Sequence, residues 1–128
     1  MIARIAATVL MLAVGAVTPV TAAPVKTIPS LDFMVEAPKL IGQRVRIENQ
    51  RVDGLSFQGG FLRLSGGSAL LQGPWSDRED FRRLIPACEK QWFDKPEDEA
   101  ACVVTIEGTV KAPSGDYPVL TDVDFIFP

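Results

Sequence analysis

The stretch RVRIENQRV, residues 44–52, alternates charged and apolar side chains in its first half. Val45 and Ile47 fall on one side of the chain, and their arginine and glutamate neighbours fall on the other. Successive side chains of a β-strand point to opposite faces of its sheet, so this alternation is typical of a strand with one buried face. The segment predicts the first strand of a sheet, with Val45 and Ile47 facing the core.

Four further strands are expected downstream, at residues 61–64, 68–72, 102–110 and 117–127. Gly66-Gly67 separates the first two of these and predicts a tight turn, so the two strands should form a hairpin. Pro113 and Gly115 place a loop at 111–116, between the last two strands.

One helix is expected between the third and fourth strands. Ser76 and Glu79 match the Ser-x-x-Glu capping box, in which two side chains satisfy unpaired backbone donors at a helix start. The residues that follow place one apolar face at helical spacing: Phe81, Leu84, Ile85 and Cys88. Pro86 lies inside this pattern, so the helix should kink or break there.

Three strands, one helix and two strands follow the element order of the OB-fold, a small, partly open barrel. We therefore expect a mainly β chain: a five-stranded OB-fold-like barrel over residues 39–128, with one helix between strands three and four. Another five-stranded α+β barrel is the alternative architecture. Residues 23–38 contain prolines and little pattern, which predicts a flexible leader.

Two long segments carry a resemblance to a known family. LIGQRVRIENQRV (40–52) and CVVTIEGTVKAPSGDYPVLTDVDFI (102–126) resemble the small exported bacterial OB-fold proteins of the tRNA-anticodon-binding-like type. The resemblance covers residues 39–127. It implies the OB-fold, and it implies little about the ligand.

Single positions add to this resemblance and also depart from it. In the family a glycine follows the apolar core of the fourth strand, as Gly108 does here, and an aspartate-valine pair marks the fifth, as Asp122-Val123 does. Many OB-folds have a glycine at the bulge of the first strand. This chain has Glu-Asn-Gln there, at residues 48–50, which leaves open how that strand bends.

Residues 1–22 have the composition of a secretory signal peptide. Arg4 precedes an apolar run, and the segment ends in small residues at Ala22, which predicts a cleavable signal and a periplasmic or secreted protein. The apolar run is about 13 residues long, shorter than the roughly 20 that span a bilayer as a helix. A retained membrane anchor is the alternative. No membrane span is expected after the signal is removed.

Removing residues 1–22 leaves 106 residues, with 12 basic against 16 acidic groups and a net charge of −4. This length predicts a single domain with a modest core, and we expect a monomer. Nonspecific binding of nucleic acid depends on phosphate neutralisation by Lys and Arg. The negative balance and the predicted export therefore disfavour nucleic acid as a partner.

Cys88 and Cys102 are the only cysteines, with 13 residues between them. In an oxidising compartment, two cysteines in a small exported domain most often pair, so a structural disulfide is expected. A redox pair is one alternative, but the Cys-x-x-Cys spacing is absent. A zinc site is another, but it needs two further ligands.

The chain contains no histidine. Ser-His-Asp and Cys-His mechanisms and histidine general bases are thereby excluded. A pair of carboxylates, as in glycosidases, is still possible, but no pair stands out among the acidic residues. We expect a non-enzyme without a metal or cofactor.

OB-folds usually bind on the face of strands two and three, framed by the loops after strands one and four. The candidate ligand-binding residues in this region are Arg46, Arg51, Phe57, Phe61, Arg63, Trp75 and Tyr117. Arginines interleaved with aromatic rings suit stacking and anion contacts, and also the recognition of sugars or peptides. Core packing is the more common role for Phe61 and Trp75, and ordinary surface charge is the more common role for Arg46 and Arg63.

The sequence thus predicts an exported, non-enzymatic binding module that engages an envelope component, either a saccharide or another exported protein. One alternative is an inhibitor or accessory subunit of a secreted hydrolase, since a rigid loop loses little entropy on binding. Another is an OB-fold that binds oligonucleotides.

Overall fold

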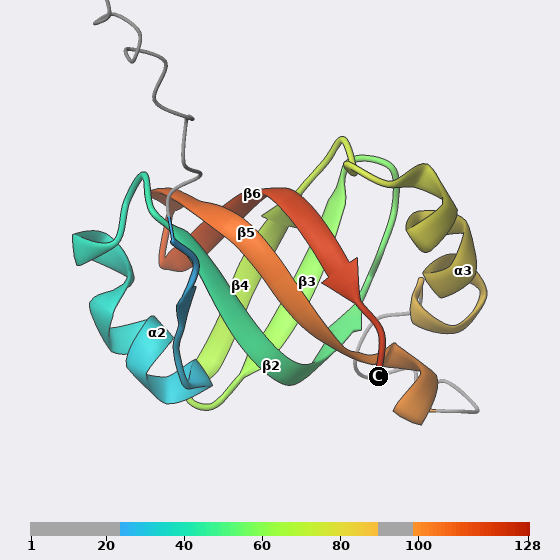
Figure 1. The fold of residues 1–128 in the computed structure, drawn as a ribbon, viewed down its shortest axis with the longest axis horizontal. Coiled ribbons are helices and arrows are strands. Elements are labelled where there is room, and N and C mark those ends of the chain that lie inside the picture. The colour runs from blue at the N-terminus through green and yellow to red at the C-terminus, as the bar shows by residue number, and fades with distance from the viewer. Residues whose placement is uncertain (1–23, 90–98) are drawn as a thin grey trace, which may run out of the picture.

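The structure is a computed structural model that describes residues 24–89 and 99–128 (Figure 1). Its strands are β1 (Lys26–Thr27), β2 (Arg44–Asp53), β3 (Gly59–Leu64), β4 (Gly67–Gln72), β5 (Val103–Ser114) and β6 (Tyr117–Ile126). Its α-helices are α2 (Ser30–Glu36) and α3 (Arg78–Cys88), and two short 3-10 helices are η2 (Ala37–Lys39) and η3 (Glu99–Cys102). The expected signal peptide lies outside the described residues. Within the described ranges, no helix has both the length and the apolar composition needed to cross a membrane.

Five of the strands form a ring. The sheet order is β1-β2-β3-β4-β6-β5, and β5 pairs back with β2. Within the ring β4 and β6 run parallel and the other pairs run antiparallel, while β1 pairs in parallel with β2. Figure 1 shows α2 and α3 at opposite ends of the ring. The expectation of a mainly β chain is confirmed. Residues 24–89 and 99–128 form a mixed sheet of six strands instead of five and two α-helices instead of one.

The interior of the ring holds the hydrophobic core. Val45, Ile47 and Val52 of β2 are completely buried, as the alternation in the sequence predicts for the first two. Phe81 and Leu84 of α3 pack into the same core. Burial of such side chains contributes about 1.5–3 kcal/mol each to folding, so the ring and α3 depend on one another.

The leader predicted at 23–38 is largely part of this packed unit. Lys26 and Thr27 pair with Val45 and Arg46 of β2. Phe33, on α2, has an exposed fraction of 0%. Two-residue strands and short helices give weak periodic signals, which explains why the sequence pattern did not reveal them.

The loop predicted at 111–116 is shorter in the structure, because β5 continues to Ser114. The ladder between β5 and β6 shifts register between Lys111 and Ser114. Pro113 lies within this irregular part and beyond the last pairing of β5 with β2, at Thr109. A proline, which lacks the N–H donor of a ladder, is tolerated at such a position.

Helix α3 begins differently from the prediction, while its end at Cys88 agrees with an apolar face that runs to that residue. Its N-cap is Asp77, whose Oδ1 accepts hydrogen bonds from the backbone N–H groups of Glu79 and Asp80 at 2.9 and 3.3 Å. Ser76 is not the cap, because its hydroxyl donates to the carbonyl of Val123 at 2.8 Å. Of the kink or break predicted at Pro86, the break is wrong. The proline lies in the last turn and the helix runs on to Cys88.

The expected disulfide between Cys88 and Cys102 is confirmed, and the Cα atoms are 5.6 Å apart. Both residues are 1% exposed. The bond joins the C-terminus of α3 to the residue that precedes β5. It therefore fixes the connection between the helix and the ring from inside the core.

Replacing both cysteines by serine should lower the free energy of unfolding by up to about 3 kcal/mol, the value expected for a crosslinked loop of this size. The melting temperature, followed by circular dichroism, should fall by roughly 4–8 °C per kcal/mol. Reductant should destabilise the unmodified protein and leave the variant unchanged. Two thiols that can be alkylated in the unreduced, native protein would contradict the disulfide.

Candidate functional site

The register of β2, β3 and β4 builds an outer face that contains most of the predicted ligand-binding residues. Val52 and Leu62 point into the core, so their neighbours in each strand point outward. Across the strands, Arg51 lies opposite Arg63, and Arg63 lies opposite Ser68. We call this surface the arginine–aromatic face and define it as Arg51, Asp53, Phe61, Arg63, Ser68 and Tyr117.

Arg63 is fixed in place by a bidentate ion pair. Its Nε and Nη2 donate to the two carboxylate oxygens of Asp53 at 2.7 and 2.8 Å, and its Nη1 donates to the Ser68 hydroxyl at 2.8 Å. The guanidinium also lies 4.8 Å from the ring centroid of Phe61. Such bidentate pairs are stronger and more directional than single hydrogen bonds. Asp53, only 1% exposed, is thereby a paired buried charge.

Phe61 and Tyr117 form the aromatic part of the face. Their ring centroids are 6.3 Å apart in an edge-to-face arrangement, a favourable geometry for two aromatic rings. Tyr117 is 44% exposed, and Phe61 is half-buried. The face therefore presents one exposed aromatic ring, Tyr117, which packs against a second, Phe61.

Arg51 is the other arginine of the face. It is half-buried, and its Nε and Nη2 are buried without a hydrogen-bond partner. Arg63, which also carries a positive charge, lies directly opposite Arg51 on β3.

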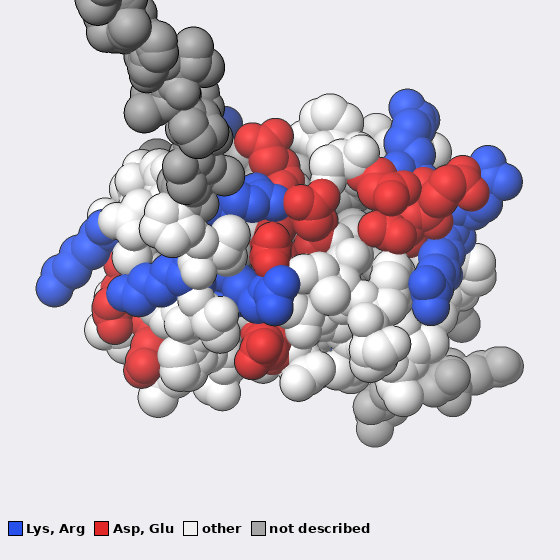
Figure 2. Space-filling view, in the orientation of Figure 1, with Lys and Arg blue, Asp and Glu red and all other residues white. Residues whose placement is uncertain are grey.

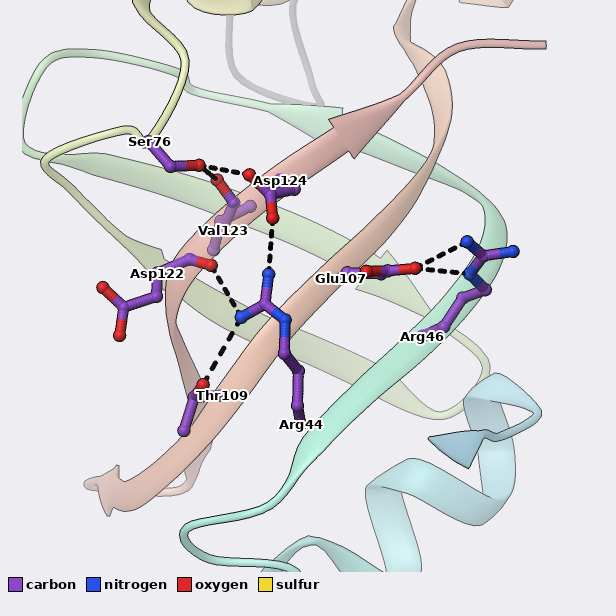
Figure 3. A network of polar contacts seen from close by, with 8 residues as sticks. All are labelled: Arg44, Arg46, Ser76, Glu107, Thr109, Asp122, Val123 and Asp124. Carbon is purple, nitrogen blue, oxygen red and sulfur yellow. Dashed lines mark hydrogen bonds and ion pairs between the residues drawn. The ribbon is translucent and has the colours of Figure 1, made fainter. Parts of the chain in front are cut away.

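Arg46 lies elsewhere, in a polar network over β2, β5 and β6 (Figure 3). Its Nε donates to Glu107 on β5 at 2.7 Å. Nearby, Arg44 donates to the Asp124 carboxylate at 2.6 Å and to the carbonyl of Asp122 at 2.9 Å, and the Ser76 hydroxyl also contacts Asp124. The contacts of Arg44 and Ser76 join β2 and the segment before α3 to β6. The Arg46–Glu107 pair joins β2 to β5, so the role of Arg46 here is structural.

Figure 2 shows one side of the molecule in space-filling form, in the orientation of Figure 1. Lys and Arg side chains are interspersed with Asp and Glu over β2, β5 and β6. On the described part of this side, the charges form no continuous basic patch of the kind that nonspecific nucleic-acid binding requires.

Phe57 lines a third region, an open cleft of about 850 Å³ between the loop 54–58 and α3. Trp75 contacts two residues of this lining without lining the cleft itself: its ring stacks on Phe81 at 5.7 Å, and its Nε1 donates to the Ser56 carbonyl at 2.9 Å. Trp75 is 6% exposed. Trp75 is thus a core residue, the more common role considered above. Phe57 is 61% exposed, and its ring lies 4.7 Å from that of Phe81.

This cleft, the α3 cleft, has an apolar floor and a mixed rim. Its lining residues are Leu55, Ser56, Phe57, Gln58, Arg78, Glu79, Phe81, Arg82, Ile85, Pro86 and Glu89. Opposite charges alternate along the rim, so the cleft has no single-sign electrostatic character.

Carboxylates also gather near the start of α3. Burial raises the pKa of Asp80 above its ordinary value of 3.8, and the nearby carboxylates of Asp77 and Asp124 raise the pKa further, while Arg83 opposes the shift. Among the described residues, no group of three or more His, Cys, Asp or Glu side chains is placed to hold a metal ion.

No protein-family model, curated protein or solved structure matches this chain in the comparisons made with each. The resemblance of residues 39–127 to the exported OB-fold family therefore stays an expectation.

The structure brings together four of the seven predicted ligand-binding residues and separates the rest. Arg51, Phe61, Arg63 and Tyr117 share one face, while Arg46 and the Phe57–Trp75 pair lie apart from it. Sequence reasoning missed Asp53 and Ser68, which orient Arg63. The spacing of Asp53 two residues after Arg51 was a signal for a shared face, but a pattern of two residues is too short to be specific.

Replacing Asp80 by Asn should raise the free energy of unfolding at neutral pH. The folded-state pKa of Asp80 is raised, so its contribution to stability is fully present below the unfolded pKa and is lost as pH rises through the folded pKa. Because asparagine does not ionise, the variant does not lose this stability as pH rises. We expect a gain of up to about 0.5 kcal/mol at pH 7, disappearing below about pH 4, where the carboxyl is protonated in the unfolded chain too.

Urea unfolding at pH 7 and pH 3 measures this effect. Asp77→Ala is the matched control, since it removes the helix cap and should destabilise the protein by about 0.5–2 kcal/mol at neutral pH. Destabilisation of the Asp80→Asn variant at pH 7 would mean that attraction to the helix N-terminus outweighs burial and repulsion.

Proposed function

We propose that this protein is an exported, non-catalytic binding module built on an OB-fold barrel, and that it binds an envelope saccharide on the arginine–aromatic face. The ring of five strands, with α3 between the third and fourth of them, supports the OB-fold. The signal-like residues 1–22 and the buried disulfide support export to an oxidising compartment.

The observation that carries the saccharide proposal is the combination of Tyr117 with fixed polar groups. The exposed Tyr117 ring offers an apolar surface, and Arg63 is held beside it through Phe61. Binding sites of this kind use aromatic area for affinity and a few fixed polar groups for orientation. OB-folds bind oligosaccharides and oligonucleotides on the corresponding face.

Oligonucleotide binding is supported less well. The face carries two arginines but also a carboxylate, Asp53, which already neutralises Arg63. The whole chain has a net charge of −3. Phosphate backbones are bound through an excess of basic groups, and a saccharide needs no such excess.

The non-catalytic part of the proposal rests on chemistry. The chain has no histidine, and the carboxylate of the face, Asp53, has both oxygens engaged by Arg63. A carboxylate held in this way is poorly available as a general base or nucleophile.

Phe57 favours a second candidate function, an inhibitor or accessory subunit of a secreted hydrolase. Its exposed ring belongs to a loop that two backbone hydrogen bonds fix in place. The Ser56 N–H donates to the Gly59 carbonyl at 2.8 Å, and the Gly73 N–H donates to the Gln58 carbonyl at 3.1 Å. A preorganised aromatic side chain on a braced loop loses little entropy when it enters a partner.

A pair of alanine variants separates the two functions. Tyr117→Ala should weaken retention on immobilised cell-wall saccharides about tenfold or more, a loss of roughly 1.4 kcal/mol. Phe57→Ala, which removes a more exposed ring outside the face (61% against 44% for Tyr117), should bind as the unmodified protein does. Isothermal titration with soluble saccharide fragments provides the affinities.

The opposite pattern, in which Phe57→Ala alone loses capture of one stoichiometric exported protein, would favour the second candidate. Turnover of the saccharide, abolished by a single carboxylate substitution, would contradict a non-catalytic role.

A further inference from the structure

The two arginines of the arginine–aromatic face present the same pair of donors in different situations. Arg63 uses Nε and Nη2, the two nitrogens along one edge of its guanidinium, to grip both oxygens of Asp53. The same two atoms of Arg51 are, within the described part of the chain, the only buried side-chain nitrogen or oxygen atoms that lack a hydrogen-bond partner. We call these two donors the fork of each arginine. The fork of Arg63 is occupied by a carboxylate, and the fork of Arg51 is empty.

The charges of this group are also unbalanced. Arg51 and Arg63 lie directly opposite each other on neighbouring strands, an arrangement in which like charges repel. Asp53 supplies one negative charge, and its oxygens are held by Arg63. One positive charge is left over, on the arginine whose donors are unpaired.

An unpaired buried donor costs free energy that a suitable acceptor recovers, and the cost is larger for charged groups. The edge formed by Nε and Nη2 matches two oxygens of one planar or tetrahedral anion, as a carboxylate or a phosphate supplies them. Because Arg51 as a whole is only half-buried, its outer torsions can turn this edge toward the surface. That rotation breaks no hydrogen bond of either nitrogen.

We infer that Arg51 is an oxyanion-binding residue, and that the ligand of the arginine–aromatic face is an acidic saccharide whose carboxylate or phosphate occupies the empty fork. The inference rests on the proposed function and specifies it further. Tyr117 packs against the sugar ring, and Arg51 binds the anionic substituent. The face therefore binds acidic saccharides more tightly than neutral ones.

The test compares an acidic oligosaccharide with its uncharged ester, and adds a simple anion as a third probe. Oligogalacturonate carries carboxylates, and its methyl-esterified form is the neutral counterpart. Inorganic phosphate tests the second source of oxyanion. Affinity is measured by isothermal titration, and melting temperature is measured with and without each probe.

Three variants accompany the unmodified protein. Arg51→Met keeps the approximate volume without the donors, and Arg51→Lys keeps the charge without the fork. Arg82→Met removes the same charge from an 80% exposed side chain on α3 and serves as the control.

We expect the unmodified protein and Arg82→Met to bind the acidic oligosaccharide about tenfold or more tightly than its methyl ester. Both Arg51 variants should bind the two forms alike. Without any probe, Arg51→Met should melt at the same temperature as the unmodified protein or higher, because it removes an unsatisfied buried donor. If phosphate alone stabilises the protein, and does so only when Arg51 is present, the oxyanion is a phosphate and the inference holds.

Three results would overturn the inference. Equal affinity of the unmodified protein for the acidic and neutral oligosaccharides, with no effect of phosphate, would remove the role of Arg51 and leave saccharide binding intact. A marked fall in the melting temperature of Arg51→Met without any probe would show that Arg51 already has a partner inside the protein. Absence of binding to every saccharide, with no response to phosphate, would remove the proposed function as well.

Discussion

The bend in β2 is the constraint on which the ring and the candidate site both depend. One strand must pair with β5 along Arg44–Arg51 and with β3 only from Arg51 onward. The register shift between Ile47 and Gln50 makes this possible, with Asn49 at φ 54° taking the left-handed conformation that a glycine would otherwise supply. The extra residue also reverses the alternation: Val45 and Ile47 point inward before the bulge, and Val52 points inward after it. Without the bulge, Arg51 and Asp53 would face the core.

The N-terminal segment pairs with the part of β2 that β3 does not reach. Because β3 pairs only with the last residues of β2, the first half of β2 has a free edge on that side, and free edges invite pairing with other chains. β1 occupies this edge by pairing with Val45 and Arg46. The Ile28 N–H continues the pairing with a hydrogen bond to the Arg46 carbonyl at 3.0 Å, and α2 follows with Phe33 fully buried. Residues before the first long strand are therefore part of the closure of the sheet.

The structural features that could be predicted from the sequence are those that a short stretch of neighbouring residues determines. Alternation in RVRIENQRV identified Val45 and Ile47 as core residues, because period-two burial is a local property of a strand. The reversal after Asn49 depends on a pairing partner more than 50 residues away in sequence, at Thr105–Ile106, and no local pattern encodes it. The same reason explains Ser76: its spacing to Glu79 fits a capping box, but its hydroxyl bonds to Val123 on β6 instead, and the neighbouring Asp77 becomes the cap.

The distribution of ion pairs shows why the candidate site could be only partly derived from residue types. Arg44, Arg46 and Arg63 look alike in the sequence, each an arginine on a predicted strand, yet all three have carboxylate partners at 2.6–2.7 Å. Those partners come from other strands or from beyond a turn, so the neutralisation of each arginine becomes visible only after folding. Pairing of this kind engages guanidinium donors within the protein, so a paired arginine has fewer donors left for a ligand. What distinguishes Arg51 is a property of the fold: its neighbour on β3 is another arginine, and the carboxylate of the same face, Asp53, is already paired with that neighbour.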